Sequence, residues 1–173
     1  KVINLGPGVD EAALADAGGH LDAKITVNFE EQGQTVAKDI VERLDGEGQV
    51  AILEGLAGAA QREGRVKGAE DVFAENEGIE LVASQDCNWD TDTAYEATKD
   101  IMTANPDVKA IFACNDNLAL AAVQRVLFAH YIGYIDPTRK RSAMMRAYYR
   151  WEPEQSHAFL IIRNCFLHKP IDN

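Results

Sequence analysis

The chain has 173 residues, of which 46% are apolar and 26% charged, and it carries a formal net charge of −11. This length and balance suit a globular domain with its own hydrophobic core, and no apolar run approaches the roughly 18 to 20 residues that cross a bilayer. The charge is uneven, with −15 on residues 1–124 and +4 on residues 125–173, where 8 of the 13 aromatic residues also lie. Because an acidic body repels a phosphate backbone, no nucleic-acid partner is expected.

The chain opens on an apolar run, Val2-Ile3-Asn4-Leu5, that is typical of an interior strand. No basic segment followed by an apolar stretch marks a signal peptide, so we interpret the start as the interior of a longer protein. Its three cysteines are Cys87, Cys114 and Cys165, and their spacing fits neither a zinc site nor a redox pair. We expect isolated thiols.

Short β-branched runs alternate with longer helical patterns from residue 24 onward. The apolar residues of the helical patterns recur on one stripe, as Val36, Ile40 and Leu44 do. The predicted elements are strands at 24–29, 49–53, 79–84 and 108–113, and helices at 31–44, at 59–76, from 91 with its N-cap in 91–93, and from 117. This order predicts an α/β fold, a parallel sheet with helices on both faces.

The pattern weakens after residue 129. Residues 130–136 fit a further strand, and residues 158–162 fit either a strand or a helix. Met144, Tyr148 and Trp151 have helical spacing. The charge and the aromatic content change near this point, which indicates two segments of different origin or role.

In open parallel sheets, ligands bind beyond the carboxyl ends of the strands, so we examined residues 28–30, 54–62, 85–90 and 114–117. The turn 55–58 lacks the third glycine of a dinucleotide motif and the lysine of a P-loop, which favours a simple tight turn. Arg62 is placed to donate to hydroxyls or a carboxylate, or alternatively to lie along the helix surface.

Trp89 and Asn115 are the other two candidates at this edge. An indole face stacks on the C–H face of a sugar ring, although Trp89 equally fits packing over a helix end. Asn115, in the run 115–117, suits polyol binding or helix capping, and one residue of the run can cap while its neighbour binds. The four histidines show no nucleophile or metal-ligand spacing, so we expect no enzyme activity, cofactor or metal.

Residues 49–73, 80–90 and 107–120 together resemble the C-terminal lobe of ribose-type periplasmic binding proteins. The similarity covers about residues 1–128, and residues 24–40 resemble the first crossing between the two lobes. The resemblance implies a remnant of the N-terminal lobe at 1–23, a C-terminal-lobe-like α/β domain at 24–137, and a divergent basic, aromatic-rich tail at 138–173.

The resemblance also implies roles for single residues. Trp89 matches the aromatic ring that stacks on the sugar, and Asn115 matches the amide that bonds sugar hydroxyls. Arg62 matches the sugar-binding arginine, with Arg65 as the alternative in the helix pattern, and Asp136 stands for the binding aspartate.

The implied function is non-enzymatic capture of a small sugar in the periplasm, for an ABC importer whose permease is the partner. One alternative is the effector-binding domain of a lactose-repressor-type transcriptional regulator. Another is a vestigial fragment without binding activity. Exposed apolar surface on a single lobe also predicts a homo-oligomer.

Overall fold

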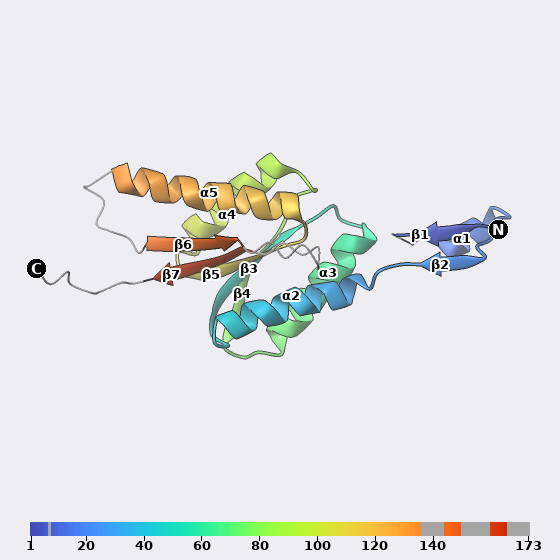
Figure 1. Ribbon diagram of the computed structural model, residues 1–173, viewed down its shortest axis with the longest axis horizontal. Helices are drawn as coiled ribbons and strands as arrows, with labels where there is room; N and C mark the ends of the chain where they lie inside the picture. The colour runs from blue at the N-terminus through green and yellow to red at the C-terminus, as the bar shows by residue number, and fades with distance from the viewer. Residues whose placement is uncertain (7, 136–143, 150–159, 166–173) are drawn as a thin grey trace, which may run out of the picture.

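The computed structural model describes residues 1–6, 8–135, 144–149 and 160–165, with side chains up to residue 126 (Figure 1). The elements in chain order are β1 (Ile3–Leu5), α1 (Glu11–Asp16), β2 (Ala23–Ile25), α2 (Phe29–Arg43), β3 (Gly48–Glu54), α3 (Ala60–Ala74), β4 (Ile79–Asp86), α4 (Thr91–Ala104), β5 (Val108–Ala113), α5 (Asp116–Ile135), β6 (Met144–Tyr149) and β7 (Leu160–Cys165).

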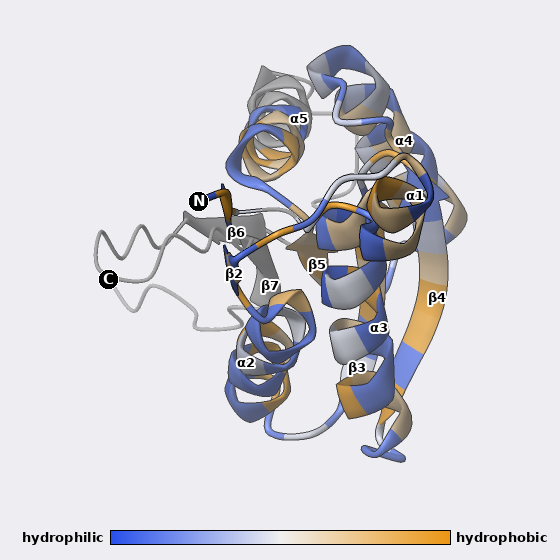
Figure 2. Cartoon of the chain, turned by 90° about the vertical axis from the view of Figure 1, so that its right-hand side faces the viewer, coloured by the Kyte–Doolittle hydropathy of each residue, from blue (hydrophilic) through white to orange (hydrophobic). Residues whose placement is uncertain are grey.

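Five strands form the main sheet in the order β4-β3-β5-β7-β6. Strand β3 pairs in parallel with β4 and β5, whereas β7 runs antiparallel to both β5 and β6. Helices α2 and α3 pack together on one face of the sheet, and α4 and α5 pack together on the other (Figures 1 and 2). The predicted α/β class, with a parallel sheet between helices, is confirmed.

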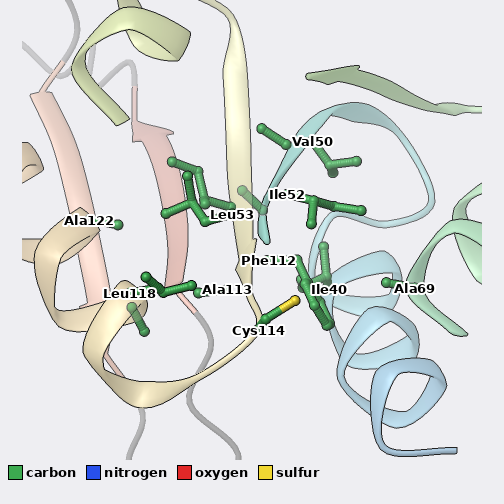
Figure 3. Packing of buried hydrophobic residues seen from close by; sticks show 14 of the residues in the cluster. Ile40, Val50, Ile52, Leu53, Ala69, Phe112, Ala113, Cys114, Leu118 and Ala122 are labelled. Atoms are coloured by element: carbon green, nitrogen blue, oxygen red, sulfur yellow. The ribbon is translucent and has the colours of Figure 1, made fainter. Parts of the chain in front are cut away.

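The centre of the core is strand β3, whose residues from Val50 to Leu53 are fully buried. Because successive strand residues point to opposite faces, Ile52 lies on the side of α2 and α3, whereas Leu53 lies on the side of α5 (Figure 3). Phe112 of β5 joins Ile52 on the first side. A strand that is apolar on both faces is typical of a parallel sheet covered twice by helices.

Helices α2 and α3 lie unusually close to each other. A Cβ added at Gly33 would overlap the carbonyl oxygen of Arg65, and a Cβ added at Gly68 would overlap the carbonyl oxygen of Glu30. Glycine at these two positions therefore lets the two helix backbones come into contact. The two helices form one tightly packed layer on their face of the sheet.

The first 25 residues form a separate β1-α1-β2 unit, in which β1 and β2 pair in parallel. It lies apart from the main sheet (Figure 1). The predicted strand at 24–29 is therefore wrong in extent, because β2 ends at Ile25 and never joins the main sheet. Asn28 instead caps α2, its Oδ1 accepting a hydrogen bond from the backbone N–H of Glu31 at 3.1 Å. The proposed division of the chain into residues 1–23, 24–137 and 138–173 stays a prediction.

Exposed apolar side chains are concentrated in the same N-terminal stretch. Of the eight large hydrophobic side chains exposed among the described residues, five belong to it, namely Val2, Ile3, Leu5, Val9 and Ile25, and a sixth, Val27, lies in the link to α2. In the described part of the main body, in contrast, Leu56 and Leu120 are the large apolar side chains that are exposed, and the others are buried or partly buried. No helix in the described part of the chain has the length and apolar character needed to cross a membrane.

Two predictions for the end of the chain are wrong. Residues 130–135 belong to α5 and not to a further strand, because the apolar helix that starts at Asp116 continues without a proline as far as Ile135. Met144–Tyr149 is a strand and not a helix, because it pairs along its whole length with β7. Residues 158–162 were predicted as either a strand or a helix, and the strand is correct for residues 160–162, which lie in β7. Asp136 and Trp151 lie outside the described residues.

Candidate functional site

The carboxyl ends of β3, β4 and β5 meet around the turn that follows β3. The backbone N–H of Cys114 donates to the carbonyl oxygen of Leu53 at 3.0 Å, and that of Cys87 donates to the carbonyl oxygen of Glu54 at 3.1 Å. These bonds hold the segment after β5 and the segment after β4 against the two residues before Gly55. The turn therefore lies between the segments that carry Asn115 and Trp89.

Trp89 occupies an uncommon backbone conformation. Asn88 and Trp89 have φ angles of +52° and +59°, in the left-handed region that bulky residues rarely adopt. The turn is held by Asp86, whose Oδ1 accepts from the N–H of Asn88 at 2.7 Å, and by the N–H of Asp90, which donates to the carbonyl of Cys87 at 2.7 Å. Residues held in such conformations concentrate at functional sites.

The structure places the indole of Trp89 against Gly55, where it is half-buried. Neither predicted role excludes the other here, since the ring packs against the core and still keeps exposed surface. Asp90 and not Thr91 caps the following helix, because its carboxylate accepts from the backbone N–H and from the hydroxyl of Thr93, at 2.7 and 2.6 Å. The predicted position of that N-cap was one residue late.

Arg62 is held in an ion-pair network at the end of β3. Its Nη2 pairs with Oε2 of Glu54, and its Nη1 donates to Oε1 of Glu63 at 2.9 Å. The hydroxyl of Ser84 donates to the other oxygen of Glu54, whose side chain is only 8% exposed. Burial alone would lower the pKa of Arg62, but the bond to Glu54 and the carboxylate charges outweigh it and raise the pKa.

This arrangement distinguishes the two predicted placements of Arg62, donation to a carboxylate and a position along the helix surface. The guanidinium does not lie loose along the helix, since it donates in fork fashion to two carboxylates of its own chain. Its Nε, buried, has no partner among the described residues. Sequence reasoning missed the buried carboxylate of Glu54, although a charged residue that ends a wholly apolar strand was a readable signal.

Arg65 lies on the same helix and reaches the other side of the turn. Its Nη1 donates to the carbonyl oxygen of Cys114 at 2.8 Å, and its Nε donates to Oε1 of Gln32 at 3.1 Å. The guanidinium carbon lies 5.4 Å from the ring centroid of Phe29. Burial lowers the pKa of Arg65, and electrostatic interactions with Cys114 and Asp116 oppose this shift. Arg65 thus reaches the β5 end of this edge, and Arg62 the β3 end.

Asn115 caps helix α5, since its Oδ1 accepts a hydrogen bond from the backbone N–H of Leu118 at 2.9 Å. The capping role predicted for the run 115–117 therefore belongs to Asn115 itself. Its amide nitrogen is a separate donor that the cap does not use. The side chain can cap and bind at the same time.

The chemistry of this edge suits binding and not covalent catalysis. Burial raises the pKa of the Cys87 and Cys114 thiols to about 12, which keeps both protonated at neutral pH. Within the described part of the chain, no group of three histidine, cysteine or acidic side chains is placed to hold a metal ion. An indole, an amide donor and charged groups around one turn match a small ligand that has apolar C–H faces and hydroxyls.

The chain is similar to known sugar-binding proteins. The chain is 36% identical to the D-allose-binding periplasmic protein of Escherichia coli, over 78% of this chain and 43% of that protein. It is 33% identical to the ribose import binding protein of Salmonella typhimurium, over 53% of this chain and 31% of that protein. The chain therefore spans less than half the length of these relatives.

A solved structure agrees with these matches. The solute-binding protein of Actinobacillus succinogenes, crystallised with D-allose, superposes with a TM-score of 0.68 at 41% identity, covering 73% of this chain and 45% of that one. The family model for the periplasmic binding protein domain matches residues 11–131. The chain belongs to the periplasmic binding protein family.

Proposed function

We propose that this chain binds a small sugar at the carboxyl edge of its sheet, without chemical conversion. The observation that carries the proposal is the half-buried indole of Trp89, held in a left-handed turn against Gly55, with the segment that carries Asn115 on the other side of the end of β3. The relatives named for D-allose and ribose supply the ligand class. We propose Trp89, Asn115 and Arg62 as ligand contacts, with Asp136 as a further one.

Arg62 has the more complex role in this proposal. Its guanidinium already pairs with Glu54 and Glu63, so a sugar hydroxyl would meet an arginine whose position is fixed beforehand. Arg65 contacts the carbonyl of Cys114, which directly precedes Asn115. We therefore assign Arg65 to holding the end of β5, and Arg62 to the ligand.

The same relatives support a role in import. We propose that the whole protein works in the periplasm as the solute-binding component of an ABC importer, and that residues 24–137 correspond to the C-terminal of its two lobes. The relatives are named as binding and import proteins, which favours transport over the repressor-like alternative. Two-lobed proteins of this kind close on their ligand about a hinge.

One lobe alone should bind weakly. It leaves part of the sugar in water and provides no closure that excludes solvent from the polar contacts. We expect dissociation constants in the millimolar range or above, that is, no more than roughly 4 kcal/mol of binding free energy.

Ligand-observed NMR with D-allose, D-ribose, D-xylose, D-galactose and inositol tests the proposal on the full chain. Saturation transfer to D-allose or D-ribose should be lost in Trp89→Ala and kept in Tyr95→Ala, which removes an aromatic ring of α4 that stacks near Arg125. Micromolar binding that Trp89→Ala leaves unchanged would place the site elsewhere. Absence of binding to every sugar would support the vestigial alternative.

A further inference from the structure

The glycine that opens the turn after β3 lies directly beneath the indole of Trp89. Gly55 is buried, and a Cβ added there would overlap three distal ring atoms of the indole, Cζ2, Cη2 and Cζ3. Overlap with three atoms of one rigid ring cannot be relieved by rotating a flexible chain end. Any side chain at position 55 therefore displaces the whole indole.

The segment that carries Trp89 has little freedom to yield. Before the ring, Cys87 is fully buried and its N–H donates to the carbonyl of Glu54. After the ring, the carboxylate of Asp90 caps α4. With the backbone held at both ends, displacement by a Cβ at Gly55 has to be absorbed by the ring itself, away from the turn.

The other side of Gly55 is occupied by the end of β5. The backbone N–H of Gly55 donates a hydrogen bond to the sulfur of Cys114, the residue before Asn115. Gly55 therefore separates the indole of Trp89 from the segment of Asn115 by the thickness of a bare backbone. A residue with a side chain at this position would change that separation.

We propose that Gly55 is a positioning residue that sets the place of the Trp89 indole relative to Asn115, and thereby the size of the sugar that this edge of the sheet accommodates. The proposal rests on the proposed function for its ligand, but the placement of the ring is independent of any ligand. A methyl group at position 55 pushes the indole outward, into the space that a stacked sugar would occupy. The hexose D-allose should then lose more affinity than the smaller pentose D-ribose.

The first experiment follows the ring without a ligand. The chain has two tryptophans, so in a Trp151→Phe background Trp89 alone is responsible for the indole fluorescence. Gly55→Ala should shift the emission to longer wavelength and increase quenching by acrylamide. The matched control is Gly58→Ala in the same turn, where φ is +81° and an added Cβ meets no atom within 4 Å. That control strains the turn but should leave the emission unchanged.

The second experiment is a rescue. Trp89→Phe removes the distal ring atoms that meet position 55, so Gly55→Ala should lower the urea midpoint much less in the Trp89→Phe background than in the parent. A Gly55→Ala chain that folds only when combined with Trp89→Phe would support the proposal in the same way. Equal losses in both backgrounds, or an unchanged emission in a folded Gly55→Ala chain, would overturn it.

Sugar titration by NMR separates this proposal from the proposed function. Gly55→Ala should weaken D-allose binding by at least about tenfold, and D-ribose binding by less, as expected when a pocket loses room for one extra carbon. If the parent binds neither sugar, the proposed function fails, and the emission and rescue data still decide the placement of the indole. If Gly55→Ala shifts the emission but binds both sugars as the parent does, the role in sugar selection is refuted.

Discussion

The guanidinium of Arg65 donates from Nη1 to the carbonyl oxygen of Cys114, with 2.8 Å between the two atoms, and so ties helix α3 to the end of strand β5. Replacing the arginine would leave this carbonyl and the amide of Gln32 without a shared donor. We expect Arg65→Met to lower the free energy of unfolding by about 1–3 kcal/mol, because the lost bonds involve a charged, half-buried donor.

Urea denaturation followed by circular dichroism checks this expectation. The matched control is Arg43→Met, which removes an arginine that pairs with Asp39 on the surface of α2 and should cost less than about 1 kcal/mol. Equal losses in the two variants would show that the contact with Cys114 does not stabilise the fold.

Asn115 combines a cap and a free donor, and substitutions can separate the two. Asn115→Ala removes both and should cost about 1 kcal/mol of stability together with sugar binding. Asn115→Asp keeps an oxygen for the N–H of Leu118 but loses the amide donor, so stability should stay near the parent value while sugar binding falls. Denaturation and NMR titration on the same samples measure both quantities. Sugar binding retained in Asn115→Asp would remove Asn115 from the ligand contacts.

The buried thiol of Cys114 makes stability depend on alkaline pH. Burial raises its pKa to about 12, whereas an exposed thiol of the unfolded chain ionises near about 8.5. The folded state therefore holds the proton more tightly, and its contribution is complete below pH 8.5. It is lost progressively between about pH 9 and pH 12.

Denaturation under reducing conditions at pH 8 and pH 10 tests this dependence. One group with such a shift accounts for a fall of roughly 1–2 kcal/mol over this interval. Cys114→Ala should fall less between the two pH values, even if it starts from a lower stability because a buried side chain is shortened. A parent and a variant that lose the same amount would contradict the assignment to Cys114.

Self-association stays a prediction, and the exposed apolar residues of the N-terminal unit indicate where to test it. Leu5 and Ile25 are 69% and 61% exposed and are register partners in the β1–β2 pair. We expect Leu5→Lys combined with Ile25→Lys to shift the chain toward monomer in light scattering coupled to gel filtration. Leu120→Lys, on an exposed position of α5, is the control that should change nothing. A parent chain that is already monomeric at high concentration would refute the prediction.

Much of the main sheet could be predicted from sequence because its central parallel strands, β3 and β5, are short apolar runs buried on both faces. Residues 108–113 were predicted to the residue, and β3 and β4 exceed their predicted ranges by one or two residues at an end. The predictions failed where pairing partners decide the structure. Met144–Tyr149 has helical spacing but pairs with β7, and no local pattern in the sequence encodes that partner.

The candidate site shows the same division. The rule that ligands gather beyond parallel strands located the segments that carry Trp89, Asn115 and Arg62. That rule does not predict contacts between residues that are distant in the sequence. From the sequence, the turn at residues 55–58 is a simple tight turn. Only the structure shows that Gly55 packs against the indole of Trp89. Likewise, the two partners of Arg65, Gln32 and Cys114, lie 33 and 49 residues away in the sequence.

The contact between helices α2 and α3 has a mechanical consequence. Residues 26 and 27 join the β1-α1-β2 unit to Asn28, the N-cap of α2, and both are exposed, so packing restrains their backbone little. Beyond them, α2 packs tightly on α3 through Gly33 and Gly68, and α3 carries both Arg62 and Arg65. A rotation of the N-terminal unit about residues 26 and 27 would therefore leave the distances between these two arginines and their partners unchanged.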